Sequence, residues 1–422
     1  MWSYVNREGD FVRKIAFVNS GILPVPPVKG GAVENLIYNI IKENENWHKC
    51  DIVSYSLSDE NLADITPYKK KYTEYKFITI PNWIRFISYL FYRIALLLNV
   101  KQVHSYRYIG HRLYYLKKVA DDLAKREDID IVILENHMTT YLTMRLHENY
   151  KKYHNRYVYH AHNEIGSFYH MKDLFDASVG FLTVSQYIAN TLERKGAKQS
   201  NVHVVHNSVD AEKFQNVMTV TEKEVWLNKF GLEKKDRIVL FVGRLIPEKG
   251  IKEAINGFIK SELKNVKMMI VGNVFFDQDV NNSYENDVTE LIKKSSGKIF
   301  ATGYVPYEDM PKLYQLADVT LLPSLWNEPA FLTGIESKAS GTPVITTDAG
   351  GIPEYIDDEC GYVLKRDEKL VENISNALRE IFTDDEKRMQ MGTKGIEKSK
   401  GKNRQSYYIS FMKALENSIL EK

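Results

Sequence analysis

Short apolar runs alternate with longer amphipathic stretches along most of the chain. In the first half, the runs typical of strands are "RKIAFVNSG", "CDIVSYSL", "KFITIP", "DIVILEN", "RYVYHAH", "VGFLTVS" and "NVHVVHN". Stretches with helical spacing of apolar residues separate most of these runs. This alternation predicts βαβ units, in which strands of one parallel sheet are connected by helices.

A second series of the same kind begins near residue 236. Its strand-like runs are "RIVLFVGRL", "VKMMIVGN", "KIFATGYV", "DVTLLPS", "TPVITTD" and "GYVLKR". Residues 211–235, between the two series, are polar and hold no strand-like run, so we expect a linker there. Near the end, "YYISFMKALENSIL" has the apolar stripe of a helix that needs a surface to cover it, and the first domain can supply that surface.

The predicted fold class is therefore α/β, with two doubly wound, Rossmann-like domains facing a cleft. The expected boundaries are an N-terminal domain at 1–210, a linker at 211–235, a C-terminal domain at 236–400 and a helix at 401–422. The length of 422 residues agrees with this division, since one hydrophobic core rarely serves more than about 250 to 300 residues.

Composition excludes several classes of protein. The chain is 44% hydrophobic and 27% charged with a net charge of +2, a balance that does not announce a nucleic-acid binder. Its two cysteines, Cys50 and Cys360, form no metal-binding or disulfide pattern. The first residues, "MWSYVNREGDFVRK", lack the basic and apolar regions of a secretory signal peptide. A reducing, cytoplasmic location is expected.

Residues 81–118 depart from this average because they combine cations and aromatic rings without one Asp or Glu. The cations are Arg85, Arg93, Lys101, Arg107, Arg112, Lys117 and Lys118. A basic, aromatic-rich helix can lie in the interface of an anionic membrane, here its inner face. A helix that packs on the core, with its arginines solvated, explains the pattern equally well. RNA binding is disfavoured because no RNA-binding motif accompanies the charge.

The candidate chemistry lies at the carboxyl ends of strands, where open α/β sheets bind ligands. After the first strand, "PVPPVKGGA" places Gly30 and Gly31 just before an amphipathic helix. Paired glycines let backbone approach a ligand, and a helix N-terminus offers unpaired N–H groups to an anion. Taken alone, however, such a pair is more often a tight turn without a ligand. It does not match a dinucleotide or Walker-type motif.

A second candidate is "FVGRLIPEKG", in which a strand ends at Gly243 and Arg244 and Lys249 follows five positions later. Arg offers a planar fork and Lys a point charge, so together they can hold two phosphates. Lys249 alone is better explained as a solvated turn residue. Arg244, directly after the strand, is harder to dismiss.

A third candidate is "EPAFLTGIE", in which two carboxylates, Glu328 and Glu336, lie eight positions apart. Pro329 suits a first helical turn, and the apolar pattern predicts a helix that ends at Gly341. On that helix the two carboxylates lie about 12 Å apart along the axis and about 80° apart around it. This spacing argues against the pair of carboxylates in a glycosidase, which faces one bond.

The same two carboxylates fit a different ligand. If the helix N-terminus near Leu332 and Thr333 holds a diphosphate through its N–H groups, Glu328 and Glu336 flank that anion. They are then suited to accept hydrogen bonds from hydroxyl groups on either side of it. A diphosphate with a polyol at each end is a nucleotide-sugar.

Six motifs in this order resemble a retaining glycosyltransferase of family 4 with the GT-B architecture. They are "PVKGGA", "HNSVD", "FVGRLIPEKG", "LPS", the E-x7-E pair and "SGTPVITTDAGG", and the resemblance covers nearly all of the chain beyond residue 13. It implies that the C-terminal domain mainly binds the donor and the N-terminal domain the acceptor. Two positions depart from the family's usual pattern. Asn207-Ser208 stands where the family usually has Asn-Gly, and "PAFLTGI" differs from the common middle of E-x7-E. The substrate of a relative is therefore not assigned to this chain.

The resemblance also implies roles for individual residues. It implies that Glu336 binds the ribose hydroxyls and that Glu328 approaches the donor sugar. Arg244 and Lys249 match the pair that binds the diphosphate, and the backbone of Leu332 and Thr333 matches its phosphate contacts. Gly30 and Gly31 match the glycine loop over the phosphates, and backbone near Tyr304 and Val305 contacts the base. His162, in "YHAHNE", matches a histidine beside the reacting sugar. Without the resemblance, His162 would be a histidine bonded to backbone at a strand end. His160 shares its face of the strand.

The activity that follows from the resemblance is transfer of a glycosyl unit from a nucleoside diphosphate sugar, with UDP the commonest carrier, and with retention. The implied acceptor is a glycan, lipid-linked or protein-linked, in cell-surface polysaccharide synthesis. The departing phosphate helps to deprotonate the acceptor, and the catalytic residues are His162, Arg244, Lys249 and Glu328. A transferase of the GT-A architecture would need an Asp-x-Asp site for a metal. The two such patterns here are Asp128–Asp130, which leads into a strand, and Asp277–Asp279, which lies in a loop, so both are interpreted as structural. No cofactor or metal is therefore expected.

Three rival activities remain open. A sugar-nucleotide epimerase of the same architecture uses similar phosphate contacts but needs no acceptor. A glycoside hydrolase needs no nucleotide, and the spacing of the two carboxylates weakens it. A non-catalytic partner that binds glycans on this fold has no reason to keep Arg244, Lys249, Glu328 and Glu336.

Overall fold

The computed structural model describes residues 12–62, 71–98, 108–272 and 283–420. The chain divides into two compact units. Unit 1 comprises Met1–His206 together with Tyr407–Lys422, and unit 2 comprises Asn207–Ser406. Asp277–Asp279, Lys101 and Arg107 lie outside the described residues.

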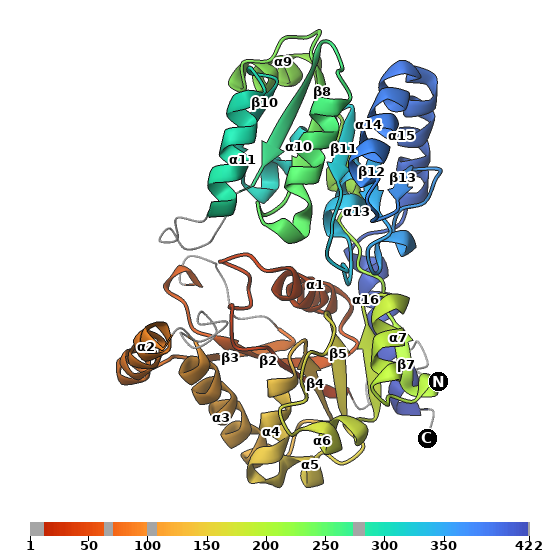
Figure 1. Cartoon of the computed structure of the whole chain (residues 1–422). Helices are drawn as coiled ribbons and strands as arrows, with labels where there is room; N and C mark the ends of the chain where they lie inside the picture. Colours follow the sequence, from red (N-terminus) through yellow and green to blue (C-terminus); the bar gives the residue numbers. More distant parts are fainter. Residues whose placement is uncertain (1–11, 63–70, 99–107, 273–282, 421–422) are drawn as a thin grey trace. The chain divides into compact units, whose positions relative to one another are not determined.

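Unit 1 is built on a parallel sheet whose described strands follow the order β3-β2-β1-β4-β5-β6-β7 (Figure 1). The strands are β1 (Lys14–Val18), β2 (Asp51–Leu57), β3 (Thr73–Ile78), β4 (Ile131–Glu135), β5 (Tyr157–Ala161), β6 (Gly180–Thr183) and β7 (Val202–Val204). The helices are α1 (Ala32–Trp47), α2 (Asn82–Leu97), α3 (Ile109–Lys125), α4 (Leu142–Arg145), α5 (Asn149–Lys152), α6 (Lys172–Asp176), α7 (Gln186–Arg194) and α16 (Arg404–Leu420).

The last helix completes the core of unit 1. Alternate residues of β1, Ile15 and Phe17, share a buried cluster with α1 and with Tyr408 and Phe411 of α16. The Tyr408 hydroxyl donates to Asn44 Oδ1 of α1 at 2.7 Å. Helix α3 lies on the opposite side of the sheet from α1 (Figure 1), where Tyr115 is fully buried. The apolar stripe of α16 therefore covers a face that α1 alone leaves incomplete.

Unit 2 is a second parallel sheet, in the order β10-β9-β8-β11-β12-β13. Its strands are β8 (Arg237–Val242), β9 (Val266–Val271), β10 (Ile299–Gly303), β11 (Val319–Leu322), β12 (Val344–Thr347) and β13 (Gly361–Leu364). Its helices are α8 (Ala211–Gln215), α9 (Val220–Lys229), α10 (Ile251–Lys260), α11 (Ser283–Lys294), α12 (Met310–Leu316), α13 (Leu332–Ala339), α14 (Leu370–Thr383) and α15 (Asp385–Ser399). The expected pair of doubly wound parallel sheets is confirmed.

The stretch 211–235, expected to be a linker, lies inside unit 2. Its helices α8 and α9 bury Phe214, Trp226 and Leu227 in the same cluster as strand β8 and helix α13. The sequence pattern misled here because these apolar residues are widely spaced between charged ones. A few large side chains on short helices are enough to fix the segment to the core.

Both sheets have a topological switch point, where the strand order runs in opposite directions from two neighbouring strands. It lies between β1 and β4 in unit 1 and between β8 and β11 in unit 2. Ligands of open α/β sheets bind outside the carboxyl ends of the strands at such points. The loops after these four strands are thus where each unit is expected to bind a ligand.

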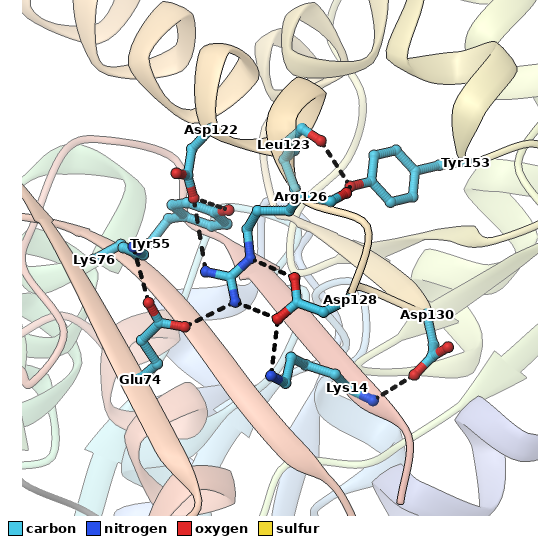
Figure 2. Close-up of polar contacts among 10 residues, drawn as sticks. All are labelled: Lys14, Tyr55, Glu74, Lys76, Asp122, Leu123, Arg126, Asp128, Asp130 and Tyr153. Atoms are coloured by element: carbon cyan, nitrogen blue, oxygen red, sulfur yellow. Dashed lines mark hydrogen bonds and ion pairs between the residues drawn. The ribbon is translucent and has the colours of Figure 1, made fainter. Parts of the chain in front are cut away.

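A polar network lies at the amino ends of the strands in unit 1, at the end of the sheet away from the switch-point loops (Figure 2). Arg126 donates to Asp128 and Glu74, and Lys14 forms an ion pair with Asp128 at 2.9 Å. Asp130 accepts from the backbone N–H of Lys14 at 2.7 Å. The carboxylates of Asp128 and Asp130 therefore hold the beginnings of β1, β3 and β4 together, which is a structural role.

Most side chains of helix α2 are exposed. Its buried residues are Ser88 and Ala95, and its exposed apolar side chains are Trp83, Phe86, Ile87, Tyr89, Leu90, Phe91, Ile94, Leu96 and Leu97. Trp83 touches Tyr114 of α3, with ring centroids 6.5 Å apart. No helix in the described part of the chain has the length and apolar character needed to cross a membrane.

Candidate active site

The switch point of unit 2 begins with a close approach of two backbones after β8. Gly243 has a φ of 155°, and a side chain on Gly272, after β9, would meet the Gly243 carbonyl oxygen at 2.0 Å. Arg244 follows directly and is exposed. Within the described residues its guanidinium has no hydrogen bond or ion pair. Among the described residues, Arg244 is thus an unpaired cation at a strand end, available to an anionic ligand.

Lys249 and Glu328 form an ion pair across this switch point. Lys249 Nζ donates to Glu328 Oε1 at 2.6 Å, and the Ser324 hydroxyl donates to the same oxygen at 2.7 Å. Glu328 is only 7% exposed. The ion pair ties the turn after β8 to the loop after β11, so two residues expected on different parts of a donor lie in direct contact.

Helix α13 starts later than the sequence pattern predicts. It begins at Leu332, with Phe331 as its N-cap, so Pro329 lies outside it. Glu328 instead forms a parallel bridge with Gly350, and its carbonyl accepts from the Gly351 N–H at 2.7 Å. This pairing with the loop after β12 holds Glu328 outside the helix. The helical estimate of the separation between the two glutamates therefore does not apply.

The N-terminus of α13 offers backbone N–H groups. No side chain caps it, so the first N–H groups of the helix, including those of Leu332 and Thr333, have no partner within the helix. The Phe331 ring lies against Gly334, where a Cβ would meet its Cδ1 at 2.2 Å. Such a helix end is suited to an anion.

Glu336 lies in the second turn of α13 and is 7% exposed. It accepts hydrogen bonds from the hydroxyls of Tyr314, at 2.8 Å, and Tyr307. Burial raises the pKa of the Glu336 carboxyl to about 7, although both tyrosines and Lys213 oppose the shift. Two protein hydroxyls thus occupy the place expected for hydroxyls of a ligand. Val305, expected near the base, lies partly buried against the same core cluster.

In unit 1, His162 belongs to a buried group of three side chains at the ends of β4 and β5. His162 Nε2 lies 3.0 Å from Glu135 Oε2 and 3.2 Å from His160 Nδ1. His160 Nδ1 lies 3.1 Å from Glu135 Oε2. A carboxylate facing two imidazoles favours the tautomers that carry a proton on these two nitrogens, which leaves Nδ1 of His162 as its acceptor.

Charge in this group is unevenly distributed. Burial by itself would raise the pKa of Glu135, but His160 and His162 bring it down to about 2. Burial and the neighbouring His160 lower the pKa of His162 to about 4, against the opposing effect of Glu135. Near neutral pH the group is therefore one carboxylate with neutral His162. Among the described residues these three side chains are the group whose atoms lie close enough together to hold a metal ion.

The glycine loop before α1 makes its own turn. Gly30 and Gly31 have φ angles of 75° and 107°, and Gly30 N–H donates to the Pro27 carbonyl at 2.9 Å. A Cβ on Gly31 would lie 2.2 Å from the carboxylate of Glu34, which is buried. Both glycines are thus needed for the backbone and for Glu34, whether or not a ligand binds.

The sequence analysis missed residues at the switch point of unit 1. Arg112 of α3 donates from Nε to the Ser20 carbonyl at 2.9 Å, and its Nη1 lies 3.2 Å from His137 Nε2. Burial lowers the pKa of Arg112, and burial together with Arg112 lowers that of His137 to about 4. Arg112 was grouped with surface cations because a basic segment does not show which arginine points inward.

Comparison with known proteins covers both units. Residues 33–213 match the family model described as Glycosyltransferase Family 4, and residues 222–398 match Glycosyl transferases group 1. The chain is 25% identical over 388 residues to spore coat protein SA of Bacillus subtilis, covering 90% of this chain and 92% of that protein. It is 22% identical over 374 residues to the lipopolysaccharide 1,2-N-acetylglucosaminetransferase of Salmonella typhimurium, covering 87% and 90%.

A solved structure shows the same fold at lower sequence identity. Anabaena Alr3699/HepE in complex with UDP and glucose superimposes with a TM-score of 0.70 at 16% identity, covering 96% of this chain and 99% of that chain. Two parallel-sheet units, two adjacent family matches and full-length relatives that include a transferase lead to one conclusion. The chain is a glycosyltransferase of the GT-B type.

Proposed function

We propose that the chain transfers a glycosyl unit from a UDP-sugar to an acceptor hydroxyl with retention of configuration, in the synthesis of a cell-surface glycan. The observation that carries the proposal is the arrangement after β8 and β11. Arg244, which has no partner in the part of the chain that the structure describes, and the Lys249–Glu328 ion pair lie at the same switch point as the uncapped end of α13. Cations and helix N–H groups at one strand edge suit a diphosphate.

The roles of the residues follow from their charges. Arg244, Lys249 and the first N–H groups of α13 stabilise the negative charge that grows on the leaving diphosphate. Glu328, once Lys249 turns to the phosphate, accepts a hydrogen bond from the donor sugar. Glu336, whose pKa is about 7, accepts hydrogen bonds from the ribose in place of a tyrosine. His162 offers its Nδ1 acceptor to the sugar.

The donor is supported by the relatives. A structural neighbour binds UDP and glucose, and a relative transfers N-acetylglucosamine in lipopolysaccharide. No step of the proposed reaction needs a metal, since the Arg and Lys supply the charge that a metal would otherwise supply.

The test is turnover of a panel of UDP-glucose, UDP-galactose, UDP-N-acetylglucosamine and GDP-mannose. With acceptor glycans, we expect one UDP-sugar to release UDP and to give an α-linked product when its own linkage is α, as read from the anomeric proton by NMR. Arg244→Ala should abolish release, while Arg379→Ala, whose arginine binds carbonyls of α10 and its C-cap, should not. A new sugar nucleotide formed without acceptor would instead identify an epimerase.

The acceptor is proposed to be presented at an anionic membrane. Helix α2 exposes aromatic and aliphatic side chains on most of its surface, and its charged residues are Arg85 and Arg93, both exposed. Apolar patches of this extent are rare on monomers, and cations among them favour an anionic lipid surface. Arg112 makes no part of this surface, because it points to Ser20.

Vesicle co-sedimentation tests this contact. The wild-type chain should bind vesicles of phosphatidylglycerol and phosphatidylcholine and not phosphatidylcholine alone. The double variant Arg85→Glu, Arg93→Glu should lose most of this binding, whereas Lys293→Glu, Lys294→Glu on α11 should keep it. If binding is unchanged and light scattering shows a dimer that Phe86→Ser dissociates, α2 is an interface between two copies of the chain.

A further inference from the structure

Among the residues that the structure describes, the switch point of unit 1 holds a cation, Arg112, without a counter-ion. Arg112 is half buried, and its two engaged nitrogens face the neutral Ser20 carbonyl and His137. Its third nitrogen, Nη2, is buried without a hydrogen-bond partner. No carboxylate in the described part of the chain forms an ion pair with it. A buried charge in this state is costly unless an ion of opposite sign joins it.

A second side chain at the same strand edge also lacks a partner. Asn19 follows β1 directly and is 2% exposed. Both Oδ1 and Nδ2 of its amide are buried without a hydrogen bond. Native proteins leave few buried polar atoms unpaired, and each one costs about 1–3 kcal/mol. This observation is independent of the charge on Arg112 and places a second polar group without a hydrogen bond beside it in the chain fold.

The backbone of Ser20 connects the two residues. Ser20, whose carbonyl holds Arg112, is the residue after Asn19, and His137 lies two residues after β4. Strands β1 and β4 pair in parallel, with Val18 opposite Leu134. Asn19 and His137 therefore emerge at the same edge, on either side of the switch point, where the fold directs ligands. Tyr169, which is 51% exposed, stacks on the His137 ring with centroids 5.8 Å apart.

We propose that Arg112 and Asn19 form an oxyanion-binding subsite, which holds a phosphate or carboxylate group of the acceptor, while His137 holds the guanidinium of Arg112 in place. The fork of Arg112 supplies the charge and the donor Nη2, and the amide of Asn19 supplies a further donor and an acceptor for a hydroxyl group. The acceptor class is thus an anionic glycoconjugate, such as a sugar attached to a phosphate. This assignment rests on the proposed transferase activity.

The probe is inorganic phosphate, titrated into the full-length protein that has been saturated with UDP, with binding followed by phosphorus NMR line width. Saturation occupies the diphosphate site of unit 2, so that added phosphate reports on another site. We expect saturable binding that Arg112→Gln weakens at least tenfold and Arg112→Lys, which keeps the charge, weakens less.

The matched control is Arg156→Gln. Arg156 is also a half-buried arginine of unit 1, and it likewise donates to backbone carbonyls, those of Ile129 and Lys152. It lies just before β5, at the other edge of the sheet. Phosphate affinity should be unchanged in this variant. An equal loss in both variants would mean that the line width reports general charge, and would overturn the assignment.

Asn19→Ala separates binding from folding. An amide without partners contributes no hydrogen bond to stability, so we expect the melting temperature to stay the same or rise while phosphate affinity falls several-fold. If Arg112→Gln and Asn19→Ala lower only the melting temperature and leave phosphate binding intact, both residues are structural and the proposal is wrong.

Affinity for UDP on the same variants distinguishes the sources of the oxyanion. An acceptor subsite predicts UDP affinity within about twofold of wild type in Arg112→Gln. A tenfold loss of UDP affinity would instead assign Arg112 to the diphosphate of the donor and overturn the acceptor assignment. If wild-type protein binds phosphate but no nucleotide, the transferase proposal fails while the oxyanion site itself stands.

Discussion

The two switch points hold similar residue types in opposite states. In unit 2, Lys249 and Glu328 neutralise each other at 2.6 Å, and Glu336 is bonded to two tyrosines. In unit 1, Arg112 has only neutral partners, and both amide atoms of Asn19 are unpaired. Apart from the exposed Arg244, the first set has partners within the protein, whereas the second leaves buried polar atoms without a protein partner among the described residues.

Because of this difference, ligand binding requires different changes in hydrogen bonding at the two sites. A diphosphate in unit 2 has to take Lys249 from Glu328, which frees that carboxylate for the sugar at the moment the phosphate is bound. A ligand in unit 1 has no ion pair to break, because Nη2 of Arg112 and the amide of Asn19 have no hydrogen bond among the described residues. The ionic part of recognition in unit 1 is therefore preorganised, and the part in unit 2 is coupled to release of a protein ion pair.

Lys249→Ala should strongly impair transfer at the unit 2 site. It removes a phosphate contact and leaves the buried Glu328 with Ser324 as its remaining side-chain partner. We expect transfer to fall about 100-fold to 1000-fold, the usual loss for one group that stabilises developing charge. Lys252→Ala, one turn along on α10 and paired with Asp287 at 2.5 Å, should retain activity. Equal loss in both variants would contradict the account.

Glu135→Gln tests whether the histidine group of unit 1 depends on its carboxylate. Glu135 is fully buried and accepts from His160 and His162. Two hydrogen bonds to a charged group contribute about 3 kcal/mol or more, so the free energy of unfolding should fall by about that amount in urea denaturation. Glu127→Gln, whose side chain is 87% exposed, should be neutral. A fully stable Glu135→Gln would show that the histidines are held by other contacts.

Glu336 predicts a pH dependence of stability. Its pKa of about 7 in the folded protein lies above the roughly 4.3 of a free glutamate, so the folded state binds this proton more tightly. The unfolded state then holds fewer protons between these values, and the free energy of unfolding falls as pH rises from about 4.5 to 7.

Glu336→Gln keeps an acceptor for Tyr314 and removes the titration. From pH 5 to pH 8 the wild-type protein should lose about 2 kcal/mol more stability than this variant. Glu368→Gln, at an exposed site, should follow the wild type. Parallel curves for wild type and Glu336→Gln would show that Glu336 ionises normally.

Removal of metal should have the smallest effect. The proposed reaction draws its positive charge from Arg244, Lys249 and α13, so transfer after extensive dialysis against EDTA should equal that of untreated protein. A different outcome would be that EDTA abolishes activity, that zinc restores it in the wild type, and that zinc does not restore it in His160→Ala. That outcome would mean that Glu135, His160 and His162 bind a metal.

Much of the fold could be predicted from the sequence, because buried parallel strands appear as apolar runs and each is flanked by helical spacing. The positions of Arg244 and Lys249 were predicted for the same reason, since both follow an obvious strand. The start of α13 was not predicted, because a backbone pairing between Glu328 and Gly350 holds Glu328 outside the helix. Such pairing joins residues far apart and has no local signal.

The groups of unit 1 were harder to predict. Glu135, Arg112 and Asn19 are ordinary residues at the ends of strands or in a helix, and only tertiary contacts show which of them is paired. Arg112 and Arg85 share one basic segment, yet one points to Ser20 and the other to solvent. Whether a buried polar atom has a partner is decided by folding, so no pattern in the sequence displays it.

The most direct test of the account is calorimetric titration of UDP into the wild-type protein, Arg244→Ala and Arg112→Gln. The account predicts tight binding by the wild type, at least tenfold weaker binding by Arg244→Ala, and unchanged binding by Arg112→Gln. Loss of UDP binding in Arg112→Gln with full retention in Arg244→Ala would contradict it, because the nucleotide would then belong to the switch point of unit 1.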